Sequence, residues 1–347
     1  MSKPKKRKLK KGYRILRGLY RFVLAVSMVI VALYIAVEMA FQAPEIAKAG
    51  ETKQETQGED LQGPAIPSTD NGKSRRDHVY TFLLAATDDG NGNADTIMVM
   101  TYDVPNKKIG VISIPRDTLT EEHPKINAAM GRGVDHLRTV VADLLGIPID
   151  YYITVDLEGF VQIVDKVGGV DFYVPCNMNY DDTTPGKELR IHYTEGMQHL
   201  TGQQAMEVVR FRHNNDYTGY NDTGRAKTQR DLITTVAKKL VSWNNLTKVD
   251  SFVKIFYTYV ETNLDVGDMG YFAKNAISLN MDSGIVSETL PTNYEGNLRT
   301  RNNSWVYQLD PEKTLNIVNT MLNPYEQPLT LEDMNIVQAK PSNLPAS

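Results

Sequence analysis

Residues 80–114 read YTFLLAATDDGNGNADTIMVMTYDVPNKKIGVISI and contain three apolar runs, Tyr80–Ala86, Thr96–Val104 and Ile109–Ile114. The runs are rich in β-branched and aromatic residues, and clusters of Asp, Gly, Asn and Pro separate them. Short runs bounded by such turn residues are typical of β-strands joined by tight connections. This stretch therefore predicts three successive strands of one sheet.

Beyond residue 114 the chain alternates between helical and extended patterns. Helices are predicted where apolar residues recur every three or four positions, and strands where short β-rich runs lie between turn residues. The predicted helices are Val134–Leu145, Leu157–Val167, Leu200–Val209, Arg225–Trp243, Val249–Thr262, Met269–Leu279 and Pro311–Met321, and the further strands are Tyr151–Val155, Val170–Val174 and Ile285–Leu290. This order predicts an α/β domain, a mixed β-sheet flanked by helices on both faces (α-β-α).

The N-terminal part differs sharply from the rest. Residues 1–21 hold ten of the chain's 38 basic residues and no acidic residue. Phe22–Phe41, which follows, is apolar except for Glu38 and is long enough for a helix to cross a hydrocarbon core of ~30 Å. Basic residues collect on the cytoplasmic side of such spans. We therefore expect a cytoplasmic tail, a single-pass transmembrane helix at 22–41 and an extracytoplasmic remainder.

A cleaved signal peptide is the alternative interpretation of the apolar segment. The segment is long for such a peptide, and Ala47-Lys48-Ala49 is only a weak candidate for a cleavage site. Residues 42–77 are polar, contain Gly and Pro and have almost no aromatic residues, which is typical of a flexible linker. We expect the folded domain at 78–325 and a C-terminal tail at 326–347.

Composition and missing motifs exclude several classes of protein. The whole chain has a net charge of −4 despite its basic tail, so its body is strongly acidic and a poor partner for nucleic acid. The single Cys176 excludes an internal disulfide and a cysteine-based zinc site. P-loop, serine-hydrolase and zinc-protease motifs are absent. The six histidines show no metal-ligand spacing, so we expect no histidine-based metal site.

Acids and arginines at the ends of predicted strands are the first candidates for chemistry. Asp88 follows the run TFLLAAT, and Asp95 opens the next strand. Both residues could form turns, or they could bind Mg²⁺, which prefers carboxylate oxygens. Arg116 and Asp117 follow a strand that Pro115 ends. They are either surface charges or ligand-binding groups at a strand end.

A second group of candidates lies in the segments VVRFRH and DTGRAKTQR. Arg210 and Arg212 share a face if their segment is extended. Arg225 and Gln229 are four residues apart and share a face of a helix. Each segment alone could be a solvated basic surface. Because the body of the chain is acidic, arginines gathered here indicate an anionic ligand, and guanidinium groups match phosphate oxygens well.

The order of these motifs resembles the LytR-CpsA-Psr family from about Tyr80 to Met321. The matching segments are FLLAATD, ADTIM, SIPRD, KINAA, YYITVDLEGF, DKVGGVD, LTGQQA with the following RFR, and DTGRAKTQ. The resemblance implies a mixed sheet flanked by helices and a long apolar pocket for a polyprenyl chain. It also implies arginines that bind a pyrophosphate, acids that hold Mg²⁺, and a bacterial cell-membrane location with the domain outside.

The function that this resemblance implies is that of a phosphotransferase. Such an enzyme moves a glycopolymer, such as teichoic acid or capsule, from a polyprenyl-pyrophosphate carrier to a peptidoglycan sugar hydroxyl with the help of Mg²⁺. Its partners are the lipid-linked polymer, peptidoglycan and the lipid bilayer. The implied residues are Asp88 and Asp95 as metal ligands, Asp88, Asp95, Arg116, Arg210 and Arg212 as catalytic residues, and Arg116, Lys125, Arg210, Arg212, Arg225 and Gln229 as pyrophosphate-binding residues.

Three positions depart from the family's usual pattern. Asn93 stands where Arg is often found, Ala86 where Gly is common, and Thr228 where a second Arg is usual. Arg132 could compensate electrostatically for Asn93. Asn93 and Thr228 keep open the alternative of a non-catalytic binder of polyprenyl-pyrophosphate lipids. A hydrolase that only cleaves the pyrophosphate is a further alternative, because water and a sugar hydroxyl can attack the same phosphorus atom. A transcription regulator is disfavoured, because the cytoplasmic tail is too short for a helix-turn-helix unit.

Overall fold

The computed structural model describes residues 41–44, 72–87, 92–185, 188–219, 222–240, 258–276, 278–280, 283–298 and 305–339. Two compact units contain them, a small one that includes 41–44 and 265–272 and a large one that includes the others. The predicted transmembrane segment, apart from Phe41, lies outside the described residues, as do the predicted cytoplasmic tail and Asp88. None of the described helices combines the length and the apolar character needed to cross a membrane.

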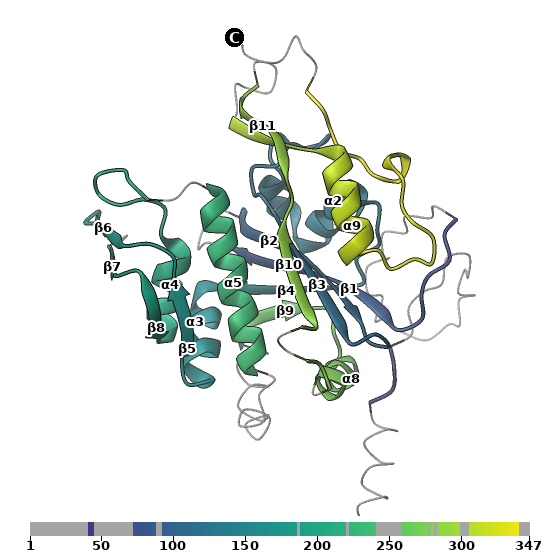
Figure 1. Ribbon diagram of the computed structural model, residues 1–347, viewed down its shortest axis with the longest axis horizontal. Helices are drawn as coiled ribbons and strands as arrows, with labels where there is room; N and C mark the ends of the chain where they lie inside the picture. The colour runs from purple at the N-terminus through teal and green to yellow at the C-terminus, as the bar shows by residue number, and fades with distance from the viewer. Residues whose placement is uncertain are drawn as a thin grey trace, which may run out of the picture. The chain divides into compact units, whose positions relative to one another are not determined.

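A six-stranded mixed sheet forms the centre of the large unit (Figure 1), in the order β10-β3-β2-β1-β4-β9. The strands are β1 (Val79–Thr87), β2 (Ala94–Asp103), β3 (Lys108–Ile114), β4 (Tyr151–Asp156), β9 (Val260–Thr262) and β10 (Ile285–Thr289). The first three pair antiparallel, as their short connections require. β4 pairs with β1 and β10 pairs with β3 in parallel. The prediction of a mixed sheet in an α/β fold is confirmed.

Helices α2 (Val134–Leu145) and α9 (Pro311–Met321) pack on one face of the sheet and have the predicted bounds. Their apolar residues share a core with alternate residues of the strands, such as Leu83 and Ala85 on β1. α2 ends at Gly146, whose left-handed backbone (φ 67°) stops the helix. The spacing of apolar residues and the residues at the helix ends therefore determine the bounds of the helices in this layer.

Helix α5 (Asp222–Leu240) packs on the other face, where it contacts β2, β3 and β10 (Figure 1). Its residues Leu232 and Val236 also enter a second core beside the sheet. The other elements of that second core are α3 (Leu157–Lys166), α4 (Gly202–Arg210), and the antiparallel pairs β5 (Val170–Val174) with β8 (Gly196–Leu200) and β6 (Met178–Asp182) with β7 (Leu189–Tyr193). α4 begins with a capping box in which Thr201 and Gln204 satisfy each other's backbone amides.

The remaining described elements show where the sequence-based predictions were incomplete or wrong. They are η1 (Ile126–Arg132), α8 (Val266–Ala276), β11 (Thr292–Asn297), β12 (Trp305–Leu309) and η2 (Leu331–Asp333). The predicted helix Val249–Thr262 is wrong at its end, because its last three residues pair with β4 as strand β9. Residues 249–257 lie outside the described residues. Leu329 and Met334 are buried in the core under α2 and α9, so packing continues past residue 325.

Gly110 on β3 allows α9 to approach the sheet closely. A Cβ atom at Gly110 would lie 2.1 Å from the carbonyl oxygen of Met321 at the end of α9. We therefore expect Gly110→Ala to lower the free energy of unfolding by about 2 kcal/mol, measured by denaturant titration. Gly131→Ala is the control, because there the nearest atom would be 3.7 Å away. Equal losses in the two variants would contradict the close-approach argument.

Candidate functional site

The ends of β2 and β3 bring two predicted site residues together. The strands pair with Ile97 opposite Ile114, so Asp95, near the start of β2, lies beside Arg116, just past the end of β3. The Arg116 guanidinium forms an ion pair with the Asp95 carboxylate through Nη1 and Oδ1. The two side chains remain 26% and 31% exposed. The pair is therefore accessible to a ligand.

A cavity of about 130 Å³ opens beside this ion pair. Four of the eight predicted site residues line it, namely Asp95, Arg116, Arg225 and Gln229. They come from β2, from the segment after β3 and from α5. The other lining residues are 96–97, 113–115, 289–292, Glu295 and Tyr307. Two guanidinium groups, two carboxylates (Asp95 and Glu295) and an amide thus border one space, and the guanidinium groups could bind a polyvalent anion there.

Gln229 connects three elements at this cavity. Its side-chain carbonyl accepts a hydrogen bond from the Thr96 hydroxyl at 3.4 Å, and its side-chain amide donates to the Val209 carbonyl at 3.2 Å. Val209 lies near the end of α4, so these bonds hold α5 against both β2 and α4. Arg225, one helical turn earlier, is only 8% exposed. Its position beside Gln229 agrees with the predicted four-residue spacing on a helix.

Arg210 and Arg212 are exposed and do not line the cavity. Among the described residues neither side chain has a hydrogen-bond or ion-pair partner. Phe211, between them, is buried and has an extended backbone (φ −58°, ψ 133°). Arg210 is still the last residue of α4, so only the segment after it is extended. Val209, the neighbour of Arg210 in the chain, accepts a hydrogen bond from Gln229, which lines the cavity.

Asp117 was a candidate at a strand end that received no role in the implied site, yet it lies near two residues of that site. Its Oδ2 lies 3.1 Å from Lys125 Nζ, and its Oδ1 lies 3.8 Å from Arg116 Nε. Asp117 is 7% exposed, so this carboxylate sits between two cations in a nearly buried place. Lys125 does not line the cavity. The one sequence signal for Asp117 was its place next to Arg116.

The positions that depart from the family pattern have different surroundings. Asn93 is exposed just before β2, and Ala86 lies near the end of β1. Thr228 is 5% exposed, and its hydroxyl donates to the Gly224 carbonyl at 3.0 Å. None of the three lines the cavity. Nine of the fifteen residues that line the cavity belong to segments that match the family motifs, and residues 289–292, Glu295 and Tyr307 do not.

Of the two predicted Mg²⁺ ligands, only Asp95 is described. Its carboxylate lines the cavity and is partly exposed. Mg²⁺ is held in many phosphate-binding sites by one or two carboxylates together with water and phosphate oxygens. The donor type and the adjoining space therefore fit this ion. Asp88, the other predicted ligand, lies outside the described residues.

A second group of possible metal ligands consists of Glu122, His123 and His136. The spacing of the histidines along the chain did not indicate this group. His136 lies thirteen positions after His123, but their Nε2 atoms are 2.9 Å apart. They meet because the segment after β3 folds against the first turn of α2. Only the tertiary structure reveals this contact.

The family model LytR_cpsA_psr matches residues 34–323, and the chain belongs to the LytR-CpsA-Psr family. Solved relatives share its fold. The crystal structure of Bacillus subtilis TagV has a TM-score of 0.59 with this chain at 26% identity, covering 71% of this chain and 96% of that structure. The central six-stranded mixed sheet is therefore that of the family.

Two curated relatives carry functional names. Over 210 residues the chain is 37% identical to the polyisoprenyl-teichoic acid–peptidoglycan teichoic acid transferase TagU of Bacillus mycoides (strain KBAB4), covering 58% of this chain and 66% of the relative. Over 189 residues it is 34% identical to the transferase of the same description, TagV, of Bacillus subtilis (strain 168), covering 52% and 47%. The chain thus spans about half to two thirds of the length of these relatives.

We expect Gln229→Ala to lower the free energy of unfolding by about 1 kcal/mol, because the Val209 carbonyl and the Thr96 hydroxyl lose their partner. Denaturant titration measures this change. Gln203→Ala is the matched control, since Gln203 is exposed on α4 and bonds only the Glu207 side chain at 2.9 Å. A Gln229 variant as stable as the Gln203 variant would show that the bridge contributes nothing.

Proposed function

We propose that this protein transfers a teichoic-acid-like glycopolymer from a polyprenyl-pyrophosphate carrier to a sugar hydroxyl of peptidoglycan. The observation that carries the proposal is the cavity bordered by Asp95, Arg116 and Arg225 in a chain of this family. The names of the curated relatives support it, because both are described as teichoic acid transferases. The partners would be the lipid-linked polymer, peptidoglycan and the bilayer.

The cavity residues have the chemistry that phosphoryl transfer needs, which is mostly positioning and charge neutralisation. Arg116 and Arg225 would bind pyrophosphate oxygens, and Gln229 would orient them by donating a hydrogen bond. Arg210 and Arg212, exposed near the end of α4, would bind the charge that extends beyond the cavity, and Lys125 would add to the positive field.

The proposed reaction is a single displacement at phosphorus. The sugar hydroxyl attacks the phosphorus atom that carries the glycopolymer, and a new phosphodiester bond forms. The bond from that phosphorus to the bridging oxygen breaks, and polyprenyl phosphate leaves with the electron pair. Asp95 or Asp88 would accept the hydroxyl proton. Asp95, together with Asp88, would also hold Mg²⁺, which neutralises charge on the pyrophosphate when bound.

We expect the double variant Arg210→Ala/Arg212→Ala to lower kcat/KM for a synthetic polyprenyl-pyrophosphate-linked glycan by at least about 100-fold. Its free energy of unfolding should change by less than about 0.5 kcal/mol, because both side chains are exposed and lack partners among the described residues. Arg190→Ala is the control, an exposed arginine on β7. Undiminished turnover in the double variant would refute the assignment.

The same assay separates transfer from the two alternatives. With Mg²⁺ and a peptidoglycan fragment, a transferase makes a glycan-linked phosphodiester product. A hydrolase releases polyprenyl phosphate at the same rate with and without the fragment. A non-catalytic binder retains the lipid in native mass spectrometry but turns over neither mixture. Only the first outcome supports the proposal.

We further propose that Phe22–Phe41 anchors the chain in the bacterial cell membrane, with 1–21 inside and the folded domain outside. The support is the apolar composition of this segment and the basic block before it. Residues 42–77 would then act as a linker between the anchor and the domain. The placement of the anchor rests on sequence composition, because residues 22–40 lie outside the described residues.

We expect the full chain to sediment with membranes and to resist carbonate extraction. The variant Val29→Arg/Val31→Arg should move into the soluble fraction, because each charge at the centre of a span costs about 2.5–3.5 kcal/mol. Thr52→Arg/Gln54→Arg adds the same charge in the predicted linker and should leave the chain in the pellet. If the Val29/Val31 variant also stays in the pellet, the anchor lies elsewhere.

A further inference from the structure

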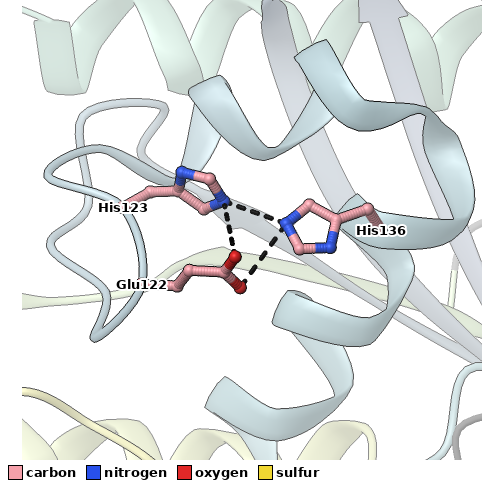
Figure 2. A group of neighbouring side chains, drawn as sticks. All are labelled: Glu122, His123 and His136. Atoms are coloured by element: carbon pink, nitrogen blue, oxygen red, sulfur yellow. Dashed lines mark hydrogen bonds and ion pairs between the residues drawn. The ribbon is translucent and has the colours of Figure 1, made fainter.

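Three potential metal ligands converge outside the cavity (Figure 2). Glu122 and His123 lie in the segment after β3, and His136 lies in the first turn of α2. The two imidazole Nε2 atoms are 2.9 Å apart. Glu122 Oε2 lies 3.5 Å from the His136 nitrogen, and Glu122 Oε1 lies 3.9 Å from the His123 nitrogen. All three side chains therefore direct a ligand atom at one point.

These separations are close to those around a tetrahedral metal. Ligand atoms about 2.0–2.1 Å from Zn²⁺ lie about 3.3 Å from one another, whereas the two nitrogens are 2.9 Å apart and Glu122 Oε2 is 3.5 Å from the His136 nitrogen. A hydrogen bond between the imidazoles accounts for their close approach, and Arg132 holds Glu122 Oε1. Oε2 lies farther from the His136 nitrogen than an ordinary hydrogen bond allows. A cation bound by the two nitrogens and Oε2 would account for this approach.

The surroundings hold the ligands in place. The Thr120 hydroxyl donates to the His123 carbonyl at 2.8 Å and accepts from the His123 amide at 3.1 Å. Thr120 is 4% exposed, so this turn is anchored in the protein. Arg132 donates to Glu122 Oε1, which leaves Oε2 directed at His136. Carboxylates that bind metals are commonly oriented by such outer hydrogen bonds.

We propose that Glu122, His123 and His136 bind a divalent transition-metal ion of the Zn²⁺ class. Two imidazoles and one carboxylate suit Zn²⁺, whereas Mg²⁺ prefers oxygen ligands throughout. The site therefore differs in chemistry from the one proposed at Asp95. Three protein ligands leave a fourth position for water. The proposal does not depend on the transfer reaction.

A bound ion would join two parts of the chain. Glu122 and His123 lie between Arg116 and Lys125, and His136 belongs to α2, which packs in the main core. The ion would tie the segment that carries these two cations to that core. The expected consequence is a higher Tm in the presence of Zn²⁺, because the ion binds the folded state.

Calorimetric titration of the full chain, prepared without a polyhistidine tag, tests the proposal directly. We expect one equivalent of Zn²⁺ to bind near pH ~7.5, with an affinity at least about tenfold weaker in His123→Asn and in His136→Asn. His199→Asn is the matched control, because His199 is exposed beside the Asp171 carboxylate at 2.7 Å.

Two further measurements keep the test decisive. Glu122→Gln keeps the shape of an exposed side chain and should weaken Zn²⁺ binding even if a histidine variant folds poorly. Co²⁺ in place of Zn²⁺ should give the visible absorption of a low-symmetry site in the wild-type chain and not in His136→Asn. Equal Zn²⁺ affinity in the wild type and all variants, or no binding by the wild type, would overturn the proposal.

Discussion

The register between β2 and β3 is the constraint on which the candidate site depends. Pairing Ile97 with Ile114 places the start of β2 and the end of β3 side by side. Asp95 and Arg116 therefore meet, although the chain between them runs to the other end of these two strands and back. A slip of one residue in either strand would turn its side chains to the opposite face and so separate this pair. Helix α5 packs on these strands and contributes Arg225 and Gln229 to the cavity lining.

Much of this arrangement could be predicted from the sequence, because local physics determines it. The three first strands are apolar runs between turn residues, and α2 and α9 have the predicted bounds because periodic apolar residues end at Gly146 or begin at Pro311. Motif order pointed to Asp95, Arg116, Arg225 and Gln229, which line one cavity.

The rest depends on contacts between distant segments. β6 and β7 are short, partly polar strands, and β9 has three residues, so each needs its partner to be recognised. β11 and β12 were not predicted, yet Glu295 and Tyr307 on them complete the cavity wall. Asp117 beside Lys125, and His123 beside His136, meet through tertiary folding. The spacing of these residues along the chain did not indicate either contact.

Because Asp95 and Arg116 form an ion pair, an anion that binds the Arg116 guanidinium through Nη1 would compete with the Asp95 carboxylate, which is already in place. A monovalent anion gains no more from that exchange than it loses, so chloride or acetate is a poor competitor. A polyvalent anion that arrives with a cation can satisfy both partners at once. The ion pair between Asp95 and Arg116 would therefore make the cavity prefer polyvalent anions to monovalent ones.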